Sequence, residues 1–178
     1  MAHKTHLLNF YAGTRSDGEG RFLREIQYWP DHKLESTHDY IQWLFPLAET
    51  SGFQPDAPIL DAKGIQEFRS RSELRRNLRA SCVRMLVFYG FELQEDDSLR
   101  IVPSKSFGER SRNWLTPSNH NHLRITRILK SLRLLGLEEE AAVFFRCLAG
   151  LYGKESATPA PRISEETFSY WRSAANSE

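Results

Sequence analysis

The sequence has few cysteines and no long hydrophobic run. Two cysteines occur among its 178 residues. The longest uninterrupted apolar stretches, such as residues 85–89, are far shorter than the roughly 20 residues of a membrane-spanning helix. No apolar run follows the charged first residues, so we expect no secretory signal peptide. Cys82 and Cys147 lie in apolar helical patterns. They are expected to be buried, reduced thiols in a cytoplasmic protein, with a disulfide or a catalytic cysteine as the alternatives.

An excess of charge of one sign is also missing. The chain has 24 Lys and Arg against 23 Asp and Glu, which leaves a net charge of +1. This balance excludes a strongly basic nucleic-acid coat and an acidic-tail protein, but it permits a local charged patch. Hydrophobic residues make up 40% and charged residues 26%, values typical of a globular protein, and the length fits one domain. Collagen, a coiled-coil rod and a wholly disordered chain are therefore excluded.

The common signatures of catalysis are absent as well. The sequence contains no phosphate-binding P-loop, no dinucleotide fingerprint, no Gly-x-Ser-x-Gly elbow, no Cys-x-x-Cys pair and no His-Glu-x-x-His motif. These absences favour a protein that is not an enzyme. They also leave no cofactor implied by the sequence.

Apolar residues recur at helical spacing along most of the chain, and one segment alternates as a hairpin does. This pattern predicts an all-α fold: a single compact helical domain of six or seven helices with one small β-hairpin near 91–102. We expect a tail over 1–8, a folded body over 9–153, a linker over 154–162 and a C-terminal helix over 163–178 packed on the body. Eight segments are candidates for these six or seven helices: 21–29, 36–47, 63–68, 72–90, 107–115, 119–135, 138–152 and 164–175.

The candidate helix over 36–47 is apolar around most of its circumference. Only His38, Asp39 and Gln42 share a polar strip, so the helix is expected in the middle of the domain. Pro46 should end or kink it. The few polar side chains of a buried helix need partners. We therefore expect Asp39 to pair with an arginine such as Arg124 or Arg127.

One candidate site is metal-binding. His120 and His122 stand two residues apart near a predicted helix start and could bind zinc together with His38 and Asp39, since zinc accepts such mixed ligands. A metal-dependent hydrolase would follow from this arrangement. The alternative is structural: His120 and Asn121 cap the helix and His122 lies on the surface.

A second candidate site lies on the flank of the helix over 119–135. Arg124, Arg127 and Ser131 fall within about 60° of arc and could clamp a carboxylate or phosphate. Lys130 belongs to a second polar edge of the same helix. The alternative is a solvated face, or ion pairs with neighbouring helices.

A third candidate is an arginine-rich face that could bind nucleic acid or a nucleotide. No exposed aromatic residue is expected beside it for base stacking, and the alternative is a solvated helix face. Its members are Arg69, Arg71, Arg75, Arg76, Arg79 and Arg84, with Arg110 and Arg112 as possible additions.

Four stretches of this sequence resemble the conserved region of the opioid growth factor receptor family. The two long ones are 38–47 and 120–132, and the two short ones are 9–11 and 85–90. The resemblance covers about residues 9–151. It implies a receptor-type function: vertebrate members are described as receptors for the pentapeptide Met-enkephalin that restrain cell growth, and they associate with the nucleus and nuclear membrane. It implies no catalytic residues.

Together these observations predict a non-enzymatic, soluble, all-α binding module for a small peptide or an anionic small molecule. Nucleic-acid binding through Arg71, Arg75, Arg76 and Arg79 is the first alternative, and the metal-dependent hydrolase is the second. The expected ligand-binding residues are His38, Asp39, Gln42, Trp43, Arg124, Arg127, Lys130 and Ser131.

Overall fold

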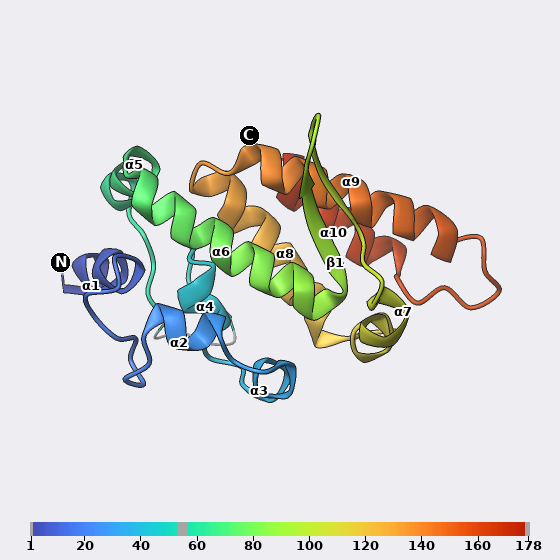
Figure 1. The fold of residues 1–178 in the computed structure, drawn as a ribbon, viewed down its shortest axis with the longest axis horizontal. Helices are drawn as coiled ribbons and strands as arrows, with labels where there is room; N and C mark the ends of the chain where they lie inside the picture. The colour runs from blue at the N-terminus through green and yellow to red at the C-terminus, as the bar shows by residue number, and fades with distance from the viewer. Residues whose placement is uncertain (1, 53–56, 177–178) are drawn as a thin grey trace. The chain divides into compact units, whose positions relative to one another are not determined.

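The computed structural model describes residues 2–52 and 57–176, and most of them are helical (Figure 1). These residues form ten α-helices, one short 3-10 helix and one two-stranded antiparallel sheet. The predicted all-α class with one small hairpin is therefore confirmed. The helices outnumber the six or seven expected because several are single short turns whose periodicity is too brief to read from sequence.

The chain divides into two compact units. The first comprises Met1–Arg84 with Leu134–Gly136, and the second comprises Met85–Arg133 with Leu137–Glu178. The long helices α6 (Ser72–Tyr89) and α8 (His120–Leu134) each contribute to both units. No helix in the described residues is both long and apolar enough to cross a membrane.

The first unit begins with a helix where a tail was predicted. Residues 1–8 fall mostly within α1 (Ala2–Tyr11), whose Leu7 and Phe10 are fully buried. The prediction was wrong because the two leucines before the Asn9-Phe10-Tyr11 stretch extend its apolar face and supply burial. The other helices of this unit are α2 (Leu23–Gln27), α3 (Asp31–Ser36), α4 (Ile41–Leu44), α5 (Ala62–Ser70) and most of α6.

The long helix predicted over 36–47 does not form. Helix α3 ends at Ser36, Thr37 is extended, and only the four residues of α4 are helical. Phe45 leaves the helical conformation because it precedes Pro46, which disfavours helical backbone at that position. The burial prediction is nevertheless confirmed, since Tyr40, Leu44 and Phe45 have no exposed surface.

Tyr11 ties the helices of the first unit together. Its hydroxyl donates to the carbonyl of Leu44, and its ring meets that of Phe68 edge-on at 4.9 Å between centroids. Asn77 Nδ2 of α6 donates to the Tyr11 carbonyl at 2.6 Å. Burial raises the pKa of the Tyr11 phenol well above its usual range, so the hydroxyl stays a donor.

The second unit contains the sheet and four further helical segments. Strands β1 (Phe91–Glu95) and β2 (Leu99–Pro103) pair antiparallel, with Leu93 opposite Ile101, at the place where the hairpin was predicted. The helical segments besides α8 are α7 (Phe107–Arg110), the 3-10 helix η1 (Ser111–Asn113), α9 (Glu138–Glu155) and α10 (Glu165–Asn176).

Trp114 lies in the core of the second unit. The indole is fully buried, and its Nε1 donates to the Tyr89 carbonyl at 2.9 Å. Its ring contacts those of Tyr89 and Phe91 at centroid distances of 5.5 and 5.9 Å. Between these two residues Gly90 turns the chain from α6 into β1 with a φ of +88°.

The C-terminal helix was predicted at nearly its observed position. Ser164 caps α10 by accepting a hydrogen bond from the Thr167 backbone N–H at 3.1 Å. Phe168 stacks on Tyr152 of α9 at a centroid distance of 4.0 Å, and the Arg172 guanidinium carbon lies over the Phe168 ring, 4.8 Å from its centroid. Helix α10 thus packs on α9 through aromatic side chains.

An ion pair closes the segment that leads into α10. Arg162 Nε donates to the buried carboxylate of Glu155 at 2.8 Å, across the stretch predicted as a linker. This hydrogen bond with Arg162 lowers the pKa of Glu155 below its usual value. The pair therefore keeps the two ends of the linker together at neutral pH.

Both cysteines are free thiols. Cys82 is buried as predicted, whereas Cys147 is only half-buried. Burial raises the pKa of the Cys147 thiol to about 11, which leaves little thiolate at neutral pH. Only the thiolate acts as a nucleophile. The structure therefore gives no support to a catalytic role for Cys147, which was one of the alternatives.

Candidate functional site

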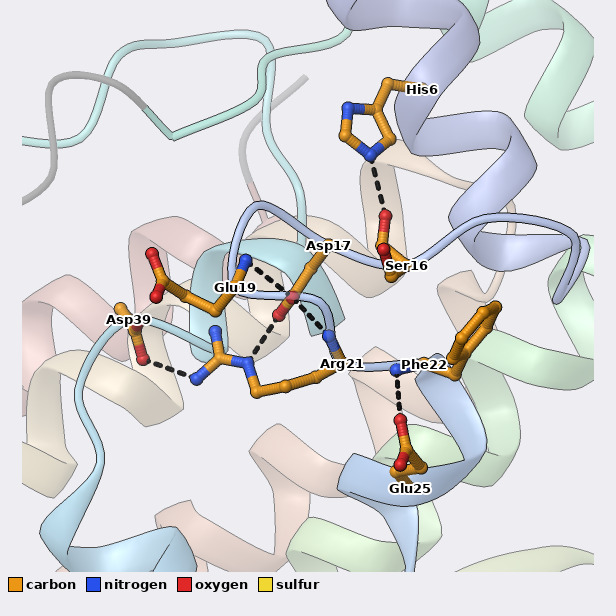
Figure 2. Close-up of polar contacts among 8 residues, drawn as sticks. All are labelled: His6, Ser16, Asp17, Glu19, Arg21, Phe22, Glu25 and Asp39. Atoms are coloured by element: carbon orange, nitrogen blue, oxygen red, sulfur yellow. Dashed lines mark hydrogen bonds and ion pairs between the residues drawn. The ribbon is translucent and has the colours of Figure 1, made fainter.

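Asp17, Arg21 and Asp39 form a polar network at the start of the 38–47 stretch, hereafter the first motif (Figure 2). Arg21 Nε donates to Asp17 Oδ2 at 2.7 Å, and Arg21 Nη1 donates to Asp39 Oδ1 at 2.9 Å. Asp17 is 4% exposed. Burial alone would lower the pKa of Arg21, but its hydrogen bonds to Asp39 and Asp17 raise it, so the guanidinium stays charged.

Local sequence explains how this network forms. Asp17 Oδ1 accepts hydrogen bonds from the backbone N–H groups of Glu19 and Arg21, both at 2.9 Å, which closes a tight turn. Gly20 takes a φ of +78° within that turn. The Glu25 carboxylate then accepts from the Phe22 backbone N–H at 2.6 Å and marks the start of α2. The turn therefore presents Arg21 in a fixed position.

Arg21 was not among the site residues predicted from the sequence. The signal that could have identified it is the four-residue spacing from Asp17 to Arg21 across two glycines, which allows an aspartate turn and an ion pair together. Asp39 was expected to pair with Arg124 or Arg127, and the structure gives it Arg21 as a partner. Arg124 and Arg127 belong to the second unit, and their pairing with Asp39 stays a prediction.

The other residues of the first motif differ in exposure. His38 is exposed, whereas Gln42 is only 5% exposed. The Oε1 atom of Gln42 is buried without a hydrogen-bond partner among the described residues. Trp43 is half-buried and meets the rings of His6 and Phe10 edge-on, at centroid distances of 5.0 and 5.3 Å. His6 Nε2 is also 2.6 Å from the Ser16 carbonyl oxygen, so α1 supports both the motif and the turn.

Replacing Arg21 by lysine is expected to lower the free energy of unfolding by about 1–2 kcal/mol, because an ammonium cannot donate to two carboxylates as a planar guanidinium does. Denaturant unfolding of the Arg21→Lys variant measures this. Arg24→Lys is the matched control, since Arg24 is exposed on the adjacent helix. An Arg21→Lys variant as stable as the wild type would show that the network does not hold the first motif.

The polar residues of the second motif, the 120–132 stretch on α8, also differ in exposure. Arg124 and Ser131 are buried, Arg127 is half-buried and Lys130 is exposed. Arg124 Nη1 donates to Asn121 Oδ1 at 3.3 Å. All four residues make further interactions. A simple solvated face therefore does not describe these positions of α8, and Lys130, on the second polar edge, is the most exposed of the four.

Asn119, one of the two asparagines at the predicted helix start, caps α8. Asn119 Oδ1 accepts the backbone N–H of Asn121 at 2.9 Å, and Asn119 Nδ2 donates to Thr116 Oγ1 at 2.9 Å. His120 is exposed, but His122 is only 5% exposed. The expectation that His122 lies on the surface is wrong, because its ring packs between two buried tryptophans, Trp114 and Trp171.

The structure does not support the predicted metal site. Across residues 2–52 and 57–176, no group of three or more His, Cys, Asp or Glu side chains is arranged to hold a metal ion. His38, Asp39, His120 and His122, the residues expected to supply it, are all within these ranges. The Nε2 atom of His122 is buried, and the rings that contact this imidazole are the indoles of Trp114 and Trp171. Indoles are not zinc ligands.

The arginine-rich face is largely engaged in bonds within the first unit. Arg75 donates to the Arg69 carbonyl, Arg76 Nη1 to Ser72 Oγ at 3.1 Å, and Arg84 Nη2 to Asp31 Oδ1 at 2.6 Å. Arg69 and Arg71 bind the Leu134 carbonyl and two glutamates respectively, and Arg79 also has a partner. These bonds favour the structural interpretation of the arginines over nucleic-acid binding.

Comparison with known proteins gives one consistent result. A family model described as the opioid growth factor receptor (OGFr) conserved region matches residues 2–176. The chain is 41% identical over 143 residues to the opioid growth factor receptor of Mus musculus and 39% identical over 143 residues to that of Homo sapiens. It is 43% identical over 123 residues to opioid growth factor receptor-like protein 1 of Mus musculus.

These matches cover most of the chain but a small part of each relative. They span 78% of the chain for the two receptors and 67% for the receptor-like protein. The same matches cover 22%, 21% and 26% of the relatives' own lengths. The chain thus corresponds to about a quarter or less of these proteins. No solved structure matches it.

Proposed function

Because the chain belongs to the opioid growth factor receptor family, we propose that it is a non-enzymatic module that binds a small peptide or an anionic ligand through the polar residues of its two motifs. Relatives named as receptors support a binding role over a catalytic one. The polar residues in question are His38, Asp39, Gln42, Arg124, Arg127, Lys130 and Ser131, and Trp43 supplies an apolar wall.

The observation that carries this proposal is the buried amide of Gln42. Its Oε1 atom has no hydrogen-bond partner among the residues described, although the residue is only 5% exposed. A buried acceptor without a donor destabilises a fold, and native proteins retain few of them. A ligand that displaces the side chains covering this atom would supply an N–H donor to it. Ligand binding would therefore explain a buried glutamine at a position where leucine, which has no polar atom, would avoid the cost of the unpaired acceptor.

Charge supports the same interpretation. Arg21 fixes one oxygen of Asp39 in the first motif, and the Asp39 side chain is 35% exposed. The second motif contributes the exposed ammonium of Lys130 and the half-buried guanidinium of Arg127. Taken separately, the first motif offers an anion that suits an amine, and the second motif offers cations that suit a carboxylate.

The test uses the pentapeptide Met-enkephalin as the probe, titrated calorimetrically into the purified chain. Gln42→Leu is expected to weaken binding at least about tenfold, equivalent to about 1.4 kcal/mol. The same variant should be as stable as the wild type or more so, because leucine of similar size removes an unpaired acceptor. Lys130→Ala is expected to weaken binding without changing the fold.

Lys154→Ala is the matched control, since Lys154 is an exposed lysine outside both motifs, and its affinity should equal that of the wild type. Unchanged affinity in both motif variants would contradict the proposed site. No heat with the peptide, together with strongly salt-dependent binding of a short single-stranded RNA, would instead support the arginine-rich face.

A further inference from the structure

His122 is a buried histidine with an unsatisfied ring nitrogen. Its Nε2 atom has no hydrogen-bond partner in the part of the chain that the structure describes, and the residue is 5% exposed. The ring meets the indoles of Trp114 and Trp171 nearly at right angles, with centroid distances of 6.3 and 5.6 Å. The two tryptophans come from different elements, so the imidazole lies at a junction within the second unit.

Helix α10 reaches this junction through Trp171. The indole is fully buried, and its Nε1 donates to the backbone carbonyl of His122 at 3.0 Å. One turn before Trp171, Phe168 stacks on Tyr152 of α9. The attachment of α10 therefore has an aromatic contact on α9 and a second contact that involves His122 directly.

We propose that His122 is a pH-sensitive latch, which holds α10 on the second unit while the imidazole is neutral and releases α10 when it is protonated. A hydrogen bond to the Trp114 backbone occupies one side of the neutral ring. Protonation would place a second N–H group and a positive charge at Nε2, where no acceptor is available among the described residues. Exposure of the ring to water relieves this cost, and release of α10 provides that exposure.

The charged surroundings of the ring do not favour the imidazolium. On α8 a charge on His120 opposes protonation of His122. Arg124, a second cationic residue of the same helix, is buried two positions further along and donates to Asn121. The segment after η1 and helix α10 pack against the ring through the uncharged indoles of Trp114 and Trp171. Their neighbouring charged residues are Arg112, which is exposed, and Arg172, which lies over Phe168. The carboxylates of α10, Glu165 and Glu166, are exposed in its first turn, more than one turn before Trp171.

The direction of the pH effect follows from these contacts. Burial lowers the pKa of His122 below its ordinary 6.5. The released form therefore binds a proton more tightly than the docked form. Attachment of α10 is strongest above pH 6.5, and it weakens as the pH falls below 6.5 until the lowered pKa of the docked form is reached.

Hydrogen–deuterium exchange of the full chain tests the latch. Between about pH 7.5 and about pH 5.5, the opening constant of α10, corrected for intrinsic exchange rates, is expected to rise by a factor of up to about ten, because each pH unit between 6.5 and the lowered pKa of the docked form contributes up to a factor of ten. Exchange in α9 serves as the internal reference and should change less. The rise should disappear in His122→Gln, which cannot be protonated, and persist in His120→Gln, the exposed neighbour.

Nuclear magnetic resonance of the wild-type imidazole provides a second measurement should His122→Gln fold poorly. The midpoint of the His122 titration is expected to coincide with the loss of α10 protection. An α10 whose protection does not change with pH would overturn the proposal. An equal rise in His122→Gln, or an imidazole that titrates while α10 stays protected, would also overturn it.

Discussion

Replacing Trp114 by alanine is expected to lower the free energy of unfolding by about 3–5 kcal/mol, the range for a buried tryptophan. The indole is fully buried and contacts Tyr89, Phe91 and His122, so the smaller side chain leaves a cavity in the core of the second unit. It also removes the donor to the Tyr89 carbonyl, at 2.9 Å in the wild type. Guanidinium unfolding followed by circular dichroism measures the loss.

Trp114→Phe separates the two contributions. Phenylalanine keeps most of the ring contacts but has no N–H group, so the Tyr89 carbonyl loses its bond to the indole. We expect this variant to lose about 1–3 kcal/mol, less than the alanine variant. A Trp114→Ala variant within about 1 kcal/mol of the wild type would contradict the central position assigned to this residue.

Gly90→Ala is expected to destabilise the fold by about 2–4 kcal/mol. Two causes act together. The backbone at Gly90 has a φ of +88°, which a side chain disfavours, and an added Cβ would lie 2.8 Å from the Phe107 Cα and 3.1 Å from the Arg110 Cβ. Backbone atoms cannot move aside as the end of a flexible side chain can. The turn from α6 into β1 would therefore shift away from α7.

Gly108→Ala is the matched control for this prediction. Gly108 lies in α7, and an added Cβ there would meet nothing within 4 Å. Alanine has a higher helix propensity than glycine. The free energy of unfolding of this variant should therefore equal that of the wild type or exceed it by up to about 1 kcal/mol. Thermal unfolding of both variants in parallel gives the comparison. Equal midpoints would show that the close approach at Gly90 is relieved without cost.

Regular elements and burial were largely predictable from the sequence. The helices over 72–90, 119–135 and 138–152 correspond to α6, α8 and α9, and the hairpin near 91–102 corresponds to β1 and β2. Each of these has a pattern long enough to show its period. The first motif was correctly expected to be buried, but its conformation was wrong. Four helical residues in α4 are too few to show a period, although the helical segment ends just before Pro46, as expected.

The polar contacts were less predictable because their partners come from separate parts of the chain. Arg21 binds Asp39 across 18 positions, and Trp171 donates to His122 across 49. No spacing rule links such residues. The sequence could thus propose a candidate site from the polar residues of two motifs, whereas Arg21, which donates to Asp39, was not identified.

The sequence by itself determined the all-α class, the long helices, the hairpin and the resemblance to the family that the comparisons then established. These depend on local periodicity and on residue identities, which are fully present in the chain. Only the tertiary structure decided which polar groups are enclosed. Packing between distant segments buries Nε2 of His122 and Oε1 of Gln42, and neither atom has a partner among the described residues. Histidine and glutamine are usually solvated at the surface, and burial removes the water that would otherwise bind them.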